Sequence, residues 1–129
     1  EAAPDKMYVR ILDRFRGGAD FSAPDYVAAW RRLRVLRQVW AAETAQYDAV
    51  LLPTVPNLPP PIDRLMADAD FYVSENLMTL RNTRVGNLMG LCGLTLPTGV
   101  PSCGLMMLGA PGADERLLRL GAAAEAALA

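Results

Sequence analysis

The sequence predicts an α/β fold, with an incomplete mixed sheet of about three strands and helices that cover it. Three short apolar runs are bounded by proline, glycine or aspartate, and stretches with helical spacing of apolar residues flank them. In addition, no residue from 85 to 113 carries a charge. Strands that are apolar on both faces need helices on each side and further strands at the edges. We therefore expect the 129 residues to build part of a larger sheet.

The first third of the chain is expected to be helical. Residues 5–16 place apolar side chains on one helical face, and the pair Gly17-Gly18 is expected to end that helix. A long amphipathic helix is predicted over residues 23–46, where Asp25 follows the candidate N-cap Ser22 by three residues, a pattern close to a capping box. Its polar face carries four arginines, which predict either an anion patch or a solvated surface. The net charge of −1 favours the solvated surface: Arg31, Arg32, Arg34 and Arg37.

The remaining elements follow from short patterns. A proline-rich loop separates the first strand from a helix, and the last two strands lie in the neutral segment, where prolines and glycines exclude a membrane helix. Asp114 and Glu115 favour the start of a terminal helix. The expected elements are strands over Ala49–Pro53, Cys92–Pro97 and Gly104–Gly109, and helices over 74–83 and 114–128.

Composition excludes several kinds of active site. Without histidine, neither a Ser-His-Asp nor a Cys-His arrangement is possible, and a histidine-containing zinc site is excluded as well. The single lysine, Lys6, begins a surface-like helix. Ser22 is expected to cap a helix, Ser74 to start one and Ser102 to lie in a turn. No phosphate-binding glycine motif is present, and we expect neither a cofactor nor a metal.

The clustered aspartates and the two cysteines are better explained by structural roles than by catalysis. Asp63, Asp68 and Asp70 cluster in a polar stretch, and solvated carboxylates explain them better than an acid–base pair. Cys92 and Cys103 could approach one another on neighbouring strands. Free buried thiols are favoured over a disulfide, although the pairing stays open.

The chain resembles the C-terminal portion of the amidase signature family. The resemblance covers nearly the whole chain and is strongest from 44 to 128, where the order and spacing of short motifs agree. The residues that carry it are Tyr47-Asp48 with Pro53-Thr54, Asn87, Gly90, Leu96-Pro97-Thr98-Gly99, Gly104-Leu105, Gly109 and Asp114.

This resemblance implies that residues 1–129 are the C-terminal fragment of a larger amidase domain, which hydrolyses C–N amide bonds. The catalytic lysine and two serines of the family belong to a Gly/Ser-rich signature upstream of the matched region, and this chain has no such run. We therefore expect the chain alone to be inactive and its natural partner to be the missing N-terminal part of the same enzyme. The alternative is a non-catalytic scaffold or oligomerisation module of amidase-like shape.

The resemblance also points to candidate substrate-binding residues: Arg81, Thr83, Arg84 and Asn87. Thr83 and Asn87 match a Thr-x-x-x-Asn pattern of the family, while Leu80 stands where relatives acting on tRNA-bound amino acids tend to have an acidic residue. Arg81 or Arg84 could bind the carboxylate of an acidic amide, or could be a rim arginine paired with an acidic side chain. For Asn87, a turn or cap position competes with the binding role.

Charge and composition set the expectations for partners. We expect a cytoplasmic protein with no nucleic acid and no membrane as partner. A small amide as the substrate of the full enzyme is what the family resemblance implies. Exposed sheet edges and a bare former interface predict that the isolated chain forms a homo-oligomer.

Overall fold

The computed structural model describes residues 3–128, which fall into two compact units that divide after Val35. The elements in chain order are the 3₁₀ helix η1 (Pro4–Lys6), α1 (Val9–Arg16), the 3₁₀ helix η2 (Gly17–Asp20), α2 (Ala23–Thr44), β1 (Val50–Pro53), α3 (Ile62–Ala67), α4 (Ala69–Thr79), α5 (Thr83–Met89), β2 (Cys92–Pro97), β3 (Gly104–Gly109) and α6 (Asp114–Leu128).

The first unit is helical, as predicted, but its first helix is shorter. The prediction of one helix over 5–16 is wrong at its start, because a 3₁₀ turn ends at Met7, whose backbone is extended, before α1 begins. The prediction that Gly17-Gly18 ends the helix is confirmed for the α-helix, which ends at Arg16, and the 3₁₀ helix η2 follows directly with Gly17 at φ −57°. The predicted cap of α2 is confirmed: the Asp25 N–H donates to Ser22 Oγ and the Ser22 N–H to the Asp25 carboxylate, both at 3.3 Å.

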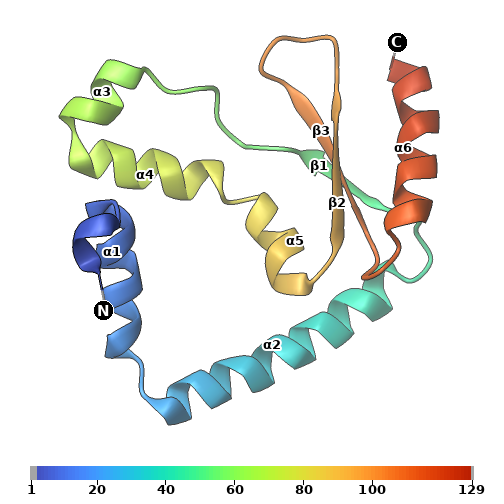
Figure 1. Cartoon of the computed structure of the whole chain (residues 1–129). Coiled ribbons are helices and arrows are strands. Elements are labelled where there is room, and N and C mark those ends of the chain that lie inside the picture. The colour runs from blue at the N-terminus through green and yellow to red at the C-terminus, as the bar shows by residue number, and fades with distance from the viewer. Residues whose placement is uncertain (1–2, 129) are drawn as a thin grey trace. The chain divides into compact units, whose positions relative to one another are not determined.

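The second unit contains a three-stranded sheet in the order β1-β3-β2 (Figure 1). The expected number of strands is confirmed, but both described pairings are antiparallel, so the sheet is not mixed within residues 3–128. For β2 and β3 the physical reason is their short connection, which forms a hairpin and cannot make a parallel crossover. In the register, Met107 of β3 lies opposite Leu94 of β2 and Leu51 of β1.

One face of the sheet forms the main core with α6. Leu96 of β2, Met107 of β3 and Leu117 of α6 are buried together, and α6 lies along this part of the sheet in Figure 1. The close approach depends on two glycines. A Cβ at Gly109 would lie 3.3 Å from Leu117 Cδ1, and one at Gly121 would lie 2.2 Å from Leu94 Cδ2.

The other face of the sheet is approached by α5. Met106 and Leu108 of β3 are buried, and a Cβ at Gly86 of α5 would lie 3.0 Å from Leu108 Cδ2. Gly90 ends α5 with φ +72°, which is the left-handed conformation that favours glycine. The Leu91 N–H donates to the Gly86 carbonyl at 2.9 Å, as in a Schellman motif, and the chain turns from α5 directly into β2.

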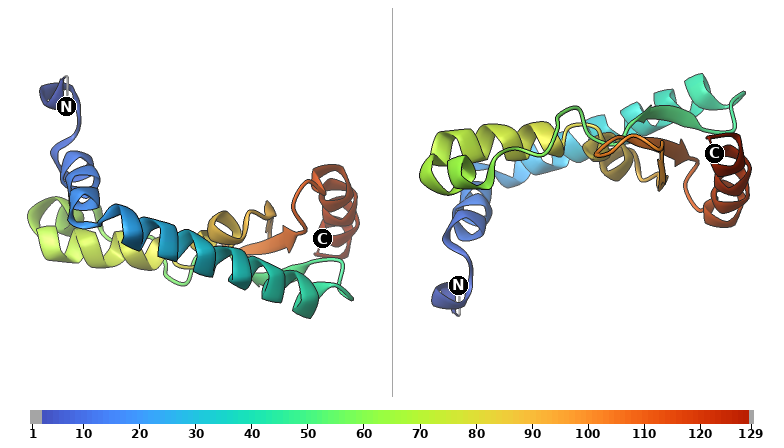
Figure 2. Two further views of the ribbon diagram at one scale, coloured as in Figure 1. Left: turned by 90° about the horizontal axis from the view of Figure 1, so that it is seen from below. Right: turned by 90° about the horizontal axis from the view of Figure 1, so that it is seen from above.

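Two helices connect the proline-rich loop to α5. Figure 2 shows α3 and α4 side by side in both views, on the side of α5 away from α6. The sequence prediction placed the start of this helix at Ser74, but α4 begins five residues earlier because the Asp68 carboxylate caps it, accepting from the Phe71 N–H at 2.9 Å. Helix α3 was not predicted; the Arg64 guanidinium lies 3.8 Å from the Phe71 ring centroid and holds the two helices together.

The buried core is small for the apolar content of the chain. Among residues 3–128 the buried hydrophobic side chains are Leu96, Met106, Met107, Leu108 and Leu117, whereas many large apolar side chains are exposed. None of the helices in this part of the chain is both long enough and apolar enough to cross a membrane. Much apolar surface is therefore available for packing against further protein.

Candidate functional site

The four predicted substrate-binding residues lie together at the junction of α4 and α5. Arg81 belongs to the turn between the helices, and its N–H donates to the Met78 carbonyl at 3.0 Å. Thr83, Arg84 and Asn87 belong to α5. At about 3.6 residues per turn, Thr83 falls on the helix surface between Asn87 and the buried Gly86. Thr83 is accordingly half-buried, while Arg84 and Asn87 are exposed.

This arrangement presents cationic and polar groups on one exposed strip. Both guanidinium-bearing residues, Arg81 and Arg84, are exposed, and no acidic side chain within residues 3–128 pairs with them. The two guanidinium groups and the Asn87 amide can donate several hydrogen bonds to a carboxylate or an amide oxygen, whereas the Thr83 hydroxyl already donates to the Leu80 carbonyl at 3.3 Å. The prediction that Asn87 caps a helix or occupies a turn is wrong, because Asn87 lies inside α5 and Gly90 ends that helix.

Two asparagines that the sequence prediction missed hold this junction in place. The Asn82 side-chain amide donates to the Pro53 carbonyl at the end of β1, at 2.7 Å. The Asn57 amide, from the proline-rich loop, donates to Glu75 Oε2 at 2.8 Å and to Thr79 Oγ1 at 3.0 Å, both on α4. An isolated asparagine gives no sequence signal for such long-range bonds, since asparagine favours local turns and caps equally well.

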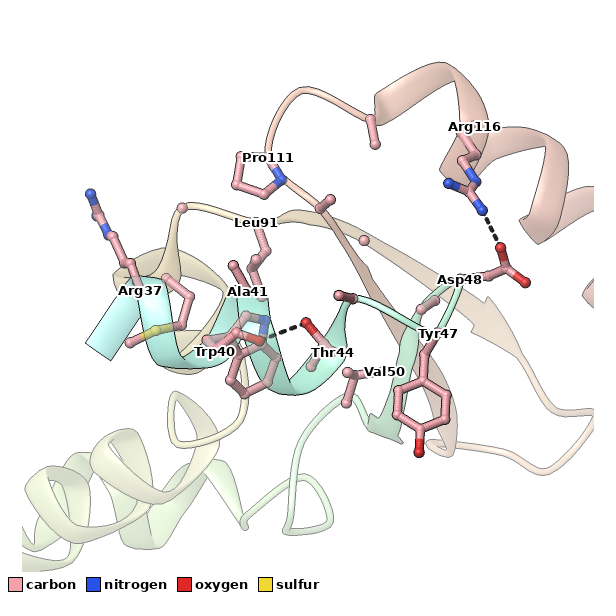
Figure 3. Close-up of a pocket in the computed structure, with 17 residues that line it drawn as sticks. Arg37, Trp40, Ala41, Thr44, Tyr47, Asp48, Val50, Leu91, Pro111 and Arg116 are labelled. Carbon is pink, nitrogen blue, oxygen red and sulfur yellow. Dashed lines mark hydrogen bonds and ion pairs between the residues drawn. The ribbon is translucent and has the colours of Figure 1, made fainter. Parts of the chain in front are cut away.

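A first cavity, of about 360 Å³, lies where the end of α2 meets the turns before β2 and α6 (Figure 3). Trp40, Leu91 and Pro111 give it an apolar lining, and Thr44 Oγ1 donates to the Trp40 carbonyl at 2.8 Å. Its charged groups already have partners. Arg116 forms an ion pair with Asp48, and Arg37 Nε donates to the Leu88 carbonyl at 2.8 Å. In Figure 3 the Arg37 side chain points away from the Trp40 ring.

A second cavity, of about 530 Å³, lies between the end of β1, the proline-rich loop and the β2–β3 hairpin. Its lining is mainly aliphatic and proline, with Ser102 and Cys103 at the hairpin. Ser102 has φ +61° and lies in the turn, as predicted. Cys103 is exposed, contrary to the expected burial, and both cysteines are free thiols. None of Arg81, Thr83, Arg84 and Asn87 lines either cavity.

The lysine and the three serines belong to four different parts of the chain. Lys6 lies in η1 and Ser22 at the start of α2, whereas Ser74 lies within α4 and Ser102 in the hairpin. Within residues 3–128, no three His, Cys, Asp or Glu side chains are grouped as a metal site requires. The side chains that the junction of α4 and α5 brings together are those of Arg81, Thr83, Arg84 and Asn87.

Several residues of the amidase-like motifs have structural roles at strand contacts. The Thr54 N–H donates to the Gly104 carbonyl at 2.9 Å, and a Cβ at Gly104 would lie 2.7 Å from Thr54 Oγ1. Leu96 is part of the core, and Asp48 ties the start of β1 to α6 through Arg116. These motif residues therefore stabilise the contacts of the strands with one another and with α6.

Comparison with known proteins gives a consistent set of relatives. The chain is 33% identical over 123 residues to the 2-amino-5-chloromuconic acid deaminase of Comamonas testosteroni, covering 90% of this chain and 26% of that protein. It is 32% identical over 106 residues to one of the polypeptides of the glutamyl-tRNA(Gln) amidotransferase of Corynebacterium jeikeium, covering 78% of this chain and 20% of that polypeptide. It is 30% identical over 112 residues to a fatty acid amide hydrolase of Oryza sativa, covering 81% of this chain and 18% of that protein.

The structural comparison agrees with the sequence comparison. A crystal structure of an amidase superposes with a TM-score of 0.75 and 27% identity, covering 98% of this chain and 30% of the amidase chain. No family model matches the chain. The chain spans about a quarter of the length of the deaminase, 26%, and the matched stretch is the C-terminal part of these relatives.

Proposed function

The chain is homologous to the C-terminal part of the amidase signature enzymes, and from this premise we propose that it is the C-terminal segment of an amidase. In this proposal the chain supplies strands of the enzyme's sheet and part of the wall of the substrate cavity. The residues that attack the amide bond come from the upstream signature. Hydrolysis of a C–N bond then requires both parts.

The observation that carries the proposal is the superposition of nearly the whole chain, 98%, on 30% of an amidase chain. The described sheet supports it. Each outer strand, β1 and β2, pairs on one side only, while the central β3 is buried on both faces. A sheet whose central strand is buried on both faces, and whose outer strands have no partner on one edge, can add further strands at those edges.

An activity assay tests the proposal. Residues 1–129 alone are expected to release no amine or ammonia from aliphatic, aromatic or acidic amides. The same chain joined to the coding sequence that precedes it in its gene is expected to hydrolyse at least one of them. Hydrolysis by residues 1–129 alone would contradict the assignment of the reactive groups to an upstream segment. Inactivity of both proteins would favour the alternative, a non-catalytic scaffold.

The proposed substrate wall is the strip formed by Arg81, Thr83, Arg84 and Asn87. In the longer enzyme, Arg81→Ala is expected to raise KM for an amide that carries a carboxylate about tenfold or more, because a charge-assisted hydrogen bond is lost. KM for a neutral amide is expected to stay the same. Steady-state kinetics on a matched pair of substrates measures this difference.

The matched control is Arg119→Ala. Arg119 is exposed on α6 and forms an ion pair with Glu115 at 2.7 Å, far in sequence from the strip, so its loss is expected to leave both KM values unchanged. Equal KM values for acidic and neutral amides in Arg81→Ala and in the unaltered enzyme would remove Arg81 from the substrate wall.

The isolated chain is expected to form a homo-oligomer. The exposed apolar side chains and the unpaired outer edges of β1 and β2 are surfaces that associate when nothing covers them. Sedimentation velocity across a range of concentrations measures this association. A sharp monomer boundary at every concentration would contradict it.

A further inference from the structure

The side chain of Asn82, the residue that precedes α5, forms its hydrogen bond outside the helix. It occupies the N-cap position of α5, where asparagine normally accepts a hydrogen bond from a backbone N–H of the first turn. The Asn82 side chain makes no such bond. Its amide instead donates to the Pro53 carbonyl, 29 residues earlier in the chain, at 2.7 Å.

The Pro53 carbonyl faces the free side of β1. The Thr54 N–H donates to the Gly104 carbonyl of β3, so the peptide unit between Pro53 and Thr54 turns its N–H toward the sheet. In a trans peptide the carbonyl of the same unit points the opposite way, and the structure contains no cis peptide among the described residues. Asn82 therefore satisfies an acceptor at the outer edge of β1, which has no strand on that side within residues 3–128.

We infer that Asn82 is a positioning residue, which ties the start of α5 to the end of β1 and so fixes the strip of Arg81, Thr83, Arg84 and Asn87 relative to the sheet. Gly86 packs against Leu108 at the middle of α5, and the Schellman turn fixes the end of the helix. The hydrogen bond of Asn82 fixes the start of the helix. The assignment of this strip to the substrate wall rests on the proposed function, whereas the anchoring itself does not.

Two variants separate anchoring from capping. Asn82→Ala removes the side-chain amide altogether, so it can neither anchor nor cap. Asn82→Asp keeps the size and is a strong helix cap near the positive end of the helix dipole, but an ionised carboxylate cannot donate to the Pro53 carbonyl. If Asn82 serves as a cap, Asn82→Asp behaves like the unaltered chain. If it serves as an anchor, Asn82→Asp behaves like Asn82→Ala.

Hydrogen–deuterium exchange of residues 1–129 measures the anchoring. Both variants are expected to exchange the amides of residues 83–90 about fivefold faster, which corresponds to the loss of one net hydrogen bond. Thr98→Val is the matched control, because it removes another side-chain-to-backbone bond, from Thr98 Oγ1 to the Cys103 carbonyl at 2.9 Å, in the hairpin. It is expected to leave exchange in residues 83–90 unchanged. Unchanged exchange in Asn82→Ala, or unaltered exchange in Asn82→Asp, would overturn the inference.

Kinetics of the longer enzyme test the consequence for the substrate. Asn82→Asp is expected to raise KM about fivefold, in proportion to the loss of the ordered strip, with kcat within about twofold of the unaltered value. Faster exchange with unchanged KM would overturn the link between this anchor and the substrate. If the unaltered longer protein hydrolyses no amide, the proposed function fails, and the exchange measurement still decides the anchoring.

Discussion

We expect the substitution Leu117→Ala to lower the free energy of unfolding by about 2–4 kcal/mol, the usual cost of a large-to-small change in a core. Leu117 is 3% exposed and lies in the cluster with Leu96 and Met107. Its side chain covers Gly109, so truncation opens space directly over the central strand. Because the buried core of residues 3–128 is small, Leu117 accounts for a large share of it.

The adjacent residue provides the control. Leu118 follows Leu117 in α6 but is 60% exposed, so Leu118→Ala is expected to change the free energy of unfolding by no more than about 0.5 kcal/mol. Urea unfolding followed by far-ultraviolet circular dichroism measures both variants, at one protein concentration because association also stabilises the fold. Equal shifts in the two variants would contradict the described packing of α6.

The substitution Gly121→Val is expected to cost about 1–3 kcal/mol, through overpacking between α6 and β2. A Cβ at Gly121 would lie 2.2 Å from Leu94 Cδ2 and 3.9 Å from Leu96 Cδ2. Alanine is a weaker test, because Leu94 Cδ2 is the end of a flexible side chain and alanine gains about 1 kcal/mol of helix propensity. Valine adds two further methyl groups to the contact, and its helix propensity is lower than that of alanine, so most of the gain in propensity over glycine is lost.

Ala123→Val is the matched control for this substitution. Ala123 lies on the exposed side of α6, so valine there changes only helix propensity, by roughly 0.6 kcal/mol. Thermal unfolding of both variants by circular dichroism measures the difference. A Gly121→Val variant as stable as Ala123→Val would show that α6 does not approach β2 as closely as described.

The sequence predicted the sheet and the last helix well, for identifiable reasons. The strands Cys92–Pro97 and Gly104–Gly109 and the helix Asp114–Leu128 have the bounds that proline, glycine and acidic residues indicated. The antiparallel pairing of β1 with β3 depends on contacts such as Thr54 with Gly104, which join distant segments. Local patterns carry no information about such pairings.

The helices between β1 and β2 were harder to predict because their signals are tertiary. Asp68 caps α4, and the prediction passed over it because the stretch is polar without clear periodicity. The Arg64–Phe71 contact and the Asn57–Glu75 hydrogen bond stabilise this region through side chains from separate elements. The same limit explains why Asn82 was missed beside the predicted site residues, since its partner is 29 positions away.

We propose that residues 1–129 complete an amidase whose reactive groups are encoded upstream. The nucleotide sequence that precedes the Glu1 codon in the source genome is the sharpest test of this proposal. We expect it to encode, in the same reading frame, a Gly/Ser-rich segment that contains a lysine and two serines. A stop codon in that frame, followed by a start codon next to Glu1, would contradict it.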